Sequence, residues 1–219
     1  MTMEIRAGYH KRLREIQGEV LALGSMVEKA ILHSVDALKS RDLTTAQEIV
    51  DNDIYVNRKR FTIEEQCIQL IATQQPMAGD LRTIVSVLSI VTELERIGDY
   101  AEGIARVVVM IGDDPPLKPL IDIPRMADKT TRMLRNSLEA FANRDAGAAR
   151  DIAAQDEEID SLYDQIFREL LTFMIEDPRT ITRATRLIWV AHNLERSADR
   201  VTNICERVVF AVTGKMEET

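Results

Sequence analysis

Leu94-Glu95-Arg96-Ile97-Gly98-Asp99 returns one hundred positions later as Leu194-Glu195-Arg196-Ser197-Ala198-Asp199. Each copy places two carboxylates four residues apart, which is the spacing of neighbours on one face of a helix. Like charges at this spacing destabilise a helix by roughly 0.2–0.5 kcal/mol unless something positive compensates them. The duplication therefore indicates a helical unit that occurs twice, and the retained acid pairs favour a bound cation.

A second stretch of sequence shows the same duplication. SVDALKSRDLTTAQEIVDND (residues 34–53) matches SLEAFANRDAGAARDIAAQD (residues 137–156) at an offset of 103. Because the later motif repeats at an offset of 100, a three-residue length difference must lie between the second and third segments of each half. Pro76 and Pro178 mark this joint in the two halves.

The composition is that of a helical protein. The 219 residues are 45% hydrophobic but only 5% aromatic, with few glycines, and the length suits one domain or two small ones. Residues 1–14 lack the apolar core of a signal peptide, and no apolar run approaches the ~18 residues that span a bilayer. A net charge of -8 argues against nucleic acid as a partner. We expect a cytoplasmic protein.

Apolar residues spaced by three and four predict six long helices. Asp42 is a plausible N-cap of the second helix. The segment 113–122, followed by Pro124, separates the two halves with four of the six prolines. Cys67 and Cys205 lie inside helical segments and are expected to be reduced core thiols. The helices are predicted at residues 5–40, 42–75, 78–112, 123–143, 145–176 and 179–213.

These segments predict an all-α fold of two tandem three-helix bundles related by an approximate twofold axis. The first bundle would span residues 1–112, the linker residues 113–122, and the second bundle residues 123–219. In this arrangement the first and fourth helices are equivalent, as are the second and fifth and the third and sixth.

The acid pairs lie where a packed helix can use them. At about 100° per residue, the acids of both repeated motifs run along the border of an apolar stripe rather than on the fully solvated side. The second and fifth helices carry pairs at matching positions, Asp53 with Asn57 and Asp156 with Asp160. If the second and third helices of each bundle pack side by side, two such pairs face each other.

Clustered carboxylates cannot all stay ionised without compensation, so they must bind a metal, pair with arginine or take up protons. Oxygen ligands without thiolates suit Mg, Mn, Ca, Fe or Zn, and bridging carboxylates can hold several ions. Arg96 and Arg196 point about 100° away from the preceding glutamates, which favours metal over a salt-bridge lattice. From spacing alone, solvated surface charge remains the alternative.

Three segments together resemble the PhoU family of phosphate-transport regulatory proteins of bacteria and archaea. They are QQPMAGDLRTI (74–84), ELERIGDYAEGIAR (93–106) and NLERSADRVTNICERV (193–208). The resemblance implies paired three-helix bundles whose E(D)xxxD motifs bind multinuclear metal clusters, commonly iron or zinc, with magnesium or manganese as alternatives. It also implies a non-enzymatic negative regulator that links the ATPase of the phosphate ABC transporter to a PhoR-type sensor histidine kinase. We further expect a homodimer that reaches the membrane only through its partners.

The family motif assigns candidate metal ligands in both halves. Asn57 stands where the first motif should end in an acid, and a neutral amide oxygen predicts a looser first-bundle site. Asp80 is either a further ligand or a helix N-terminal acid favoured by the dipole, and His192 is either a ligand or a residue at the edge of the core. The ligands implied by the resemblance are Asp53, Glu95, Asp99, Asp156, Asp160, Glu195 and Asp199.

Other function classes are weighed by the same residues. A ferritin-like di-iron enzyme needs Glu-x-x-His pairs, and no histidine here follows a glutamate by three residues, so we expect no enzyme. A metal-free helical adaptor remains the alternative.

The basic residues Arg179, Arg183 and Arg186 could pair within the protein or dock a partner, and residues 58–60 are expected to be solvated.

Overall fold

A computed structural model describes residues 2–217, and the side chains of residues 8–217. Its described part is helical without strands, which confirms the all-α prediction. None of these helices combines the length and the apolarity that crossing a membrane requires. The elements are α1 (Thr2–Ser40), α2 (Leu43–Gln74), α3 (Gly79–Ile111), α4 (Asp122–Asn143), α5 (Ala146–Ala153), α6 (Asp156–Glu176), the 3-10 turn η1 (Pro178–Thr180) and α7 (Ile181–Thr213).

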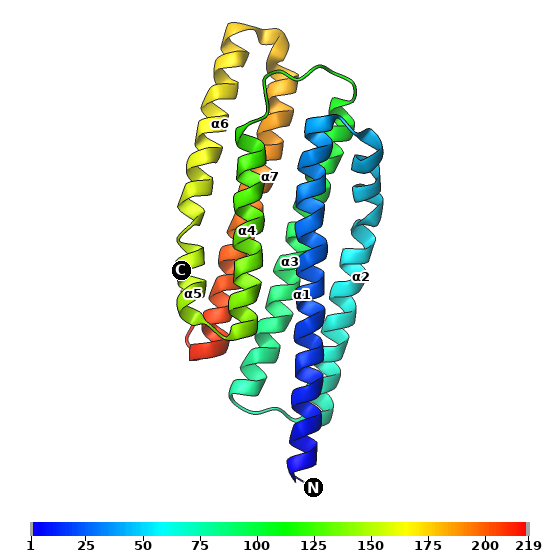
Figure 1. The fold of residues 1–219 in the computed structure, drawn as a ribbon, viewed down its shortest axis with the longest axis vertical. Coiled ribbons are helices and arrows are strands. Elements are labelled where there is room, and N and C mark those ends of the chain that lie inside the picture. Colours follow the sequence, from blue (N-terminus) through cyan, green and yellow to red (C-terminus); the bar gives the residue numbers. More distant parts are fainter. Residues whose placement is uncertain (1, 218–219) are drawn as a thin grey trace.

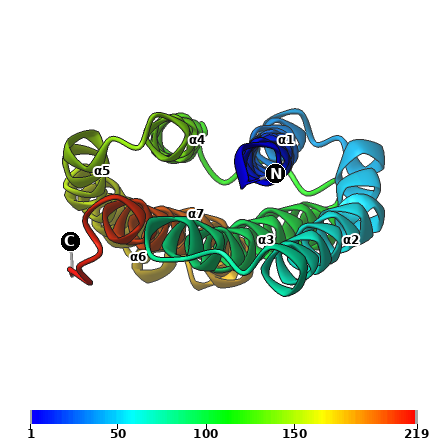
Figure 2. The same ribbon diagram turned by 90° about the horizontal axis from the view of Figure 1, so that it is seen from below.

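The helices form two layers. Figures 1 and 2 show α1 and α4 side by side in one layer, and α2, α3, α7 and α6 in this order in the other. The short helix α5 lies below α6 at the same edge and packs against α7 and α4 (Figure 1). The central helices α3 and α7 carry the repeated motif and run antiparallel along each other (Figure 1). Both copies of the motif therefore lie on the two helices, α3 and α7, through which the two halves pack against each other.

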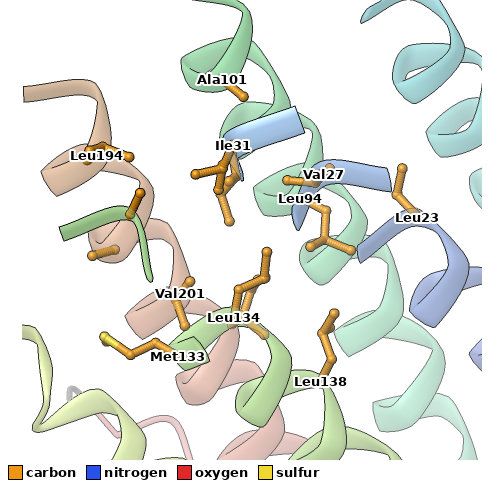
Figure 3. Packing of buried hydrophobic residues seen from close by; sticks show 14 of the residues in the cluster. Leu23, Val27, Ile31, Leu94, Ala101, Met133, Leu134, Leu138, Leu194 and Val201 are labelled. Atoms are coloured by element: carbon orange, nitrogen blue, oxygen red, sulfur yellow. The ribbon is translucent and has the colours of Figure 1, made fainter. Parts of the chain in front are cut away.

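One hydrophobic core joins both halves. Side chains from α1, α3, α4 and α7 meet between the layers, among them Leu23, Leu94, Leu134 and Leu194 (Figure 3). The apolar stripes predicted from periodicity are buried in this core. A Cβ on Gly24 would overlap Cδ1 of Leu138, so this glycine lets the Leu138 side chain of α4 pack directly against α1.

The turn before the second helix of each half has the same construction. Asp42 caps α2 by accepting a hydrogen bond from the Thr45 amide at 3.0 Å, which confirms the predicted cap. Asp145 caps α5 in the same way through the Ala148 amide at 2.9 Å. The preceding residue is in the left-handed region in both halves, with φ of 59° at residue 41 and 55° at residue 144.

The predicted helix 145–176 is wrong in one respect, because it is broken between α5 and α6. The Gln155 amide bonds to the Ile152 carbonyl at 3.0 Å, which closes a tight turn. The next residues, Asp156, Glu157 and Glu158, supply three acids to the first turn of α6. A new helix N-terminus stabilises negative charge, whereas a helix interior does not. The break thus places Asp156 at the start of α6.

The linker is fixed against α7 by arginines. Arg183 donates a hydrogen bond to the Pro115 carbonyl at 3.3 Å, and Arg186 lies 3.7 Å from Asp114. Arg179 instead pairs with Asp177 at 2.9 Å. All three arginines are therefore engaged within the protein, which supports the ion-pairing interpretation of this basic face over partner docking.

Candidate functional site

The first-bundle acids lie at the contact between α2 and α3. Asp53 comes from α2, and Glu95 and Asp99 come from α3. Gly98 allows this contact, because an added Cβ would lie 3.0 Å from Cγ1 of Val56 and 3.5 Å from Oδ1 of Asp53. The glycine of the motif thus lets Val56 of α2 pack closely against the backbone of α3, next to Asp53.

The first-bundle carboxylates repel one another. Partial burial, and then the charges of Glu102 and Glu95, raise the pKa of Asp53 above its usual range. Partial burial followed by Glu95, Asp53 and Glu102 raises the pKa of Asp99 to about 6. Glu102 therefore belongs to this cluster although the motif omits it. The signal for it was its place on the same helix border, seven residues after Glu95.

Arg60 was expected to be solvated but lies at the first-bundle site. Its Nη1 donates to Oε1 of Glu95 at 2.8 Å, and its Nε donates to Oε1 of Glu64 at 2.8 Å. Lys59 was also expected to be solvated but pairs with Glu19 of α1. Both errors have one cause: contacts between helices join residues far apart in sequence and leave no local pattern.

The amide of Asn57 already serves one acid of this cluster. Its Nδ2 donates to Oδ2 of Asp53 at 2.8 Å. Together with Arg60, this amide compensates part of the negative charge on the first-bundle site. The first-bundle site therefore has less uncompensated negative charge with which to attract a cation.

The second-bundle acids lie at the contact between α6 and α7. Partial burial, and then Asp160, Asp199 and Glu195, raise the pKa of Asp156 to about 7. The pKa of Asp160 and the pKa of Glu195 are also raised, first by burial and then by Asp199. The structure therefore brings all four predicted acids of this half, Asp156, Asp160, Glu195 and Asp199, into one electrostatic cluster.

Two oxygen atoms of this cluster lack partners. Oδ1 of Asp156 and Oε2 of Glu195 are buried and accept no hydrogen bond from the described part of the chain. Buried acceptors are seldom left without a partner. His192 Nδ1 lies 3.4 Å from that oxygen of Glu195. The His192 side chain is 53% exposed, so the core-edge interpretation is wrong. Two unpartnered carboxylate oxygens on adjacent helices fit a bound cation.

The expectation that the motif arginines form no salt bridges with the clustered acids is wrong for Arg196. It pairs with Asp199, three residues further along α7. Residues three apart are neighbours on a helix, and the long arginine side chain reaches back to the acid. One of the four second-bundle acids is therefore compensated by arginine, while the unpartnered oxygens belong to Asp156 and Glu195.

The acids do not converge on a single point. Within the described residues, no three side chains of His, Cys, Asp or Glu are grouped as ligands of one metal ion. Asp80 lies in the first turn of α3, roughly four turns before Glu95, as a helix N-terminal acid does.

Cys67 and Cys205 are buried and free, and burial raises the pKa of each thiol to about 12.

Comparisons with known proteins match nearly the whole chain. The sequence model of the PhoU domain fits twice, over residues 20–108 and 123–208. The chain is 37% identical to the phosphate-specific transport system accessory protein PhoU homolog of Pseudomonas putida, covering 98% of this chain and 84% of that one. It is also 37% identical to the homolog of Clostridium acetobutylicum, covering 94% and 95%.

Solved structures agree in fold. The crystal structure of PhoU from Pseudomonas aeruginosa superposes with a TM-score of 0.89 at 35% identity, over 94% of this chain and all of that one. The regulatory protein PhoU of the phosphate transport system from Streptococcus pneumoniae gives a TM-score of 0.90 at 31% identity, over 96% and 100%. The duplicated domain match agrees with the internal repeat, and the chain belongs to the PhoU family.

Proposed function

We propose that this protein is a non-enzymatic, metal-binding negative regulator of phosphate uptake and of phosphate-starvation signalling. Support comes from family membership and from relatives named as accessory proteins of phosphate-specific transport. The observation that carries the metal part is the pair of unpartnered buried oxygens of Asp156 and Glu195 in a mutually repelling cluster.

The residues that would hold the metal are the acids of the two helix contacts. In the second bundle they are Asp156, Asp160, Glu195 and Asp199, and in the first bundle Asp53, Glu95 and Asp99. A multinuclear iron or zinc cluster, or magnesium or manganese ions, would supply positive charge that relieves the repulsion. The bound metal would thereby stabilise the packing of α6 against α7 and of α2 against α3 at these acid clusters.

The proposed partners are a PhoR-type sensor histidine kinase, the ATPase subunit of the phosphate ABC transporter and a second copy of the chain. The proposal places the protein in the cytoplasm, in contact with the membrane only through these partners. In this role the protein lowers kinase output and transport when phosphate is plentiful.

Deleting the gene in its host tests the regulatory role. A phosphate-starvation reporter and the rate of phosphate uptake should both rise in high phosphate, and the wild-type gene should restore repression. A double variant, Asp156→Asn with Asp199→Asn, should restore it poorly if metal is needed, whereas Asp151→Asn, an exposed acid outside the cluster, should restore it fully. A deletion strain with unchanged reporter and uptake would refute the regulatory role.

A metal-free helical adaptor is the competing function. The observation in its favour is that no three candidate ligands of the described chain are grouped around one point. Elemental analysis of protein purified without chelator distinguishes the two: the proposal expects stoichiometric iron, zinc, magnesium or manganese that is lost in the double variant. Absence of bound metal, with full repression in the host, would leave the adaptor.

A further inference from the structure

A histidine lies at the second-bundle acid cluster without belonging to the repeated acid motif. His192 and Glu195 are three residues apart on α7, which makes them neighbours on one side of the helix. His192 Nδ1 lies 3.4 Å from Oε2 of Glu195, yet this buried oxygen accepts no hydrogen bond from the described part of the chain. The nitrogen and the oxygen are therefore close to each other without being joined by a hydrogen bond.

The separation of these two atoms is that of two ligands on one metal ion. Zinc binds imidazole nitrogen at about 2.0–2.1 Å and carboxylate oxygen at about 2.0–2.2 Å, and its ligands are arranged tetrahedrally. Two such ligands are about 3.4 Å apart. An ion bound to both His192 and Glu195 thus agrees with the observed separation, and it would give the buried oxygen of Glu195 a positive partner.

Helix α6 contributes two groups beside this pair. The ring of Tyr163 packs on the ring of His192, with 6.0 Å between the centroids and an angle of 48° between the planes. Asp160 is near enough to Glu195 for its charge to act on that carboxylate. The tyrosine therefore orients the imidazole, and the aspartate adds attraction for a cation. Because the His192 side chain is half exposed, an ion can reach it from solvent.

We infer that His192 is a metal ligand of the second bundle and that it selects zinc, iron(II), cobalt or nickel over magnesium and calcium. Imidazole nitrogen suits the first group of ions, whereas carboxylates and water suit the second. In the first bundle Thr92 stands in the place of His192, so that cluster offers oxygen atoms alone. The two bundles then differ in the class of metal that they prefer. This inference rests on the metal part of the proposed function.

The number of protein ligands determines how firmly the ion is held. The described residues bring no three candidate ligands around one point, so water would complete the coordination of an ion on His192 and Glu195. Structural zinc sites are instead closed by four protein ligands. We therefore expect an ion that binds reversibly and can be removed by a chelator.

Trp189 provides a readout of binding close to His192. It is the only tryptophan of the chain, and it precedes His192 by three residues on α7. Nickel bound at His192 should quench the fluorescence of Trp189 in the chelator-treated full chain. Zinc, which does not quench, should restore the fluorescence by displacing nickel.

Replacing His192 by the residue of the first bundle tests its role as a ligand. His192→Thr should weaken nickel and zinc binding at least about tenfold, because losing a metal-binding imidazole costs no less than losing a group that only supports one. Magnesium, titrated by calorimetry, should bind the wild type and His192→Thr equally. The matched control is His10→Thr, an exposed histidine of α1, which should bind all three ions as the wild type does. Circular dichroism checks that helical content is unchanged.

Nuclear magnetic resonance of the imidazole nitrogens distinguishes a ligand from a structural residue. The chain has three histidines, and zinc should shift the Nδ1 resonance of His192, whereas magnesium should not. Zinc and nickel binding that is the same in wild type and His192→Thr would overturn the inference and leave metal binding to the acids. An equal loss of magnesium affinity, or an unshifted Nδ1, would overturn it as well. A wild type that binds neither zinc nor nickel would refute this inference together with the metal part of the proposed function.

Discussion

Replacing Asp156 by asparagine should stabilise the metal-free protein at pH 8. The folded protein holds the pKa of Asp156 at about 7, against the ordinary aspartate value of 3.8. This difference in pKa would correspond to about 4 kcal/mol if it acted in full. Because the residue is only partly buried, solvent screening reduces this to about 1–2 kcal/mol. Losing a charge at the first turn of α6 subtracts about 0.3–1 kcal/mol, so the expected net gain is about 1 kcal/mol.

The stability gained by Asp156→Asn should increase as the pH rises. A raised carboxyl pKa means that the folded state binds a proton that the unfolded chain has already lost. The penalty is therefore absent below the unfolded pKa, grows between about pH 4 and 7, and is complete above pH 7. Asp156→Asn should thus gain most at pH 8 and little as the pH approaches 4.

Urea unfolding of chelator-treated wild type and variant at pH 4.5, 6 and 8 measures this dependence. At pH 8 the expected gain corresponds to a melting temperature about 2–4 °C higher. Asp151→Asn, the exposed acid of α5, is the control and should show no pH-dependent gain. With saturating zinc the sign should reverse, because the wild type alone would be stabilised by the ion. A variant less stable at pH 8, or equally stabilised at every pH, would refute the argument from repulsion.

Three further outcomes are expected. In calorimetric titrations with zinc, the second bundle should fill first, because it has four acids and two unpartnered oxygens. Asp199→Asn should therefore remove the tighter sites, and Asp99→Asn should remove the weaker ones. Equal affinities of the two bundles would contradict the charge argument. Arg60→Gln should lower the stability of the metal-free protein by about 1 kcal/mol, measured by urea unfolding. The same variant should strengthen zinc binding in the first bundle, measured by the calorimetric titration. No change in stability or in zinc binding would show that the ion pair is dispensable. Gly24→Ala should cost about 1–3 kcal/mol in urea unfolding through overpacking, whereas Gly18→Ala, with open space around it, should gain about 0.5–1 kcal/mol; equal gains would contradict the close helix approach.

The sequence alone was sufficient for the helical plan and for most of the acid clusters. The repeat of residues 94–99 indicated duplication, and apolar spacing indicated helices and their buried faces. Asp42 identified the start of α2 by its capping chemistry. These features are local, because helix periodicity and caps depend on residues within a few positions of one another. Position on a helix border likewise placed the acids beside a neighbouring helix.

Only the tertiary structure determined how those acids are compensated. The pairing of Arg60 with Glu95, the free oxygen of Asp156 and the docking of Arg183 on the linker join residues that are distant in the chain. The same holds for the continuous core between α3 and α7, which makes one packed unit of two sequence repeats. Burial and the distances between charged groups set pKa values, and both arise only when the helices pack. A repeated motif can therefore locate acid pairs, but packing determines which of their oxygens remain free.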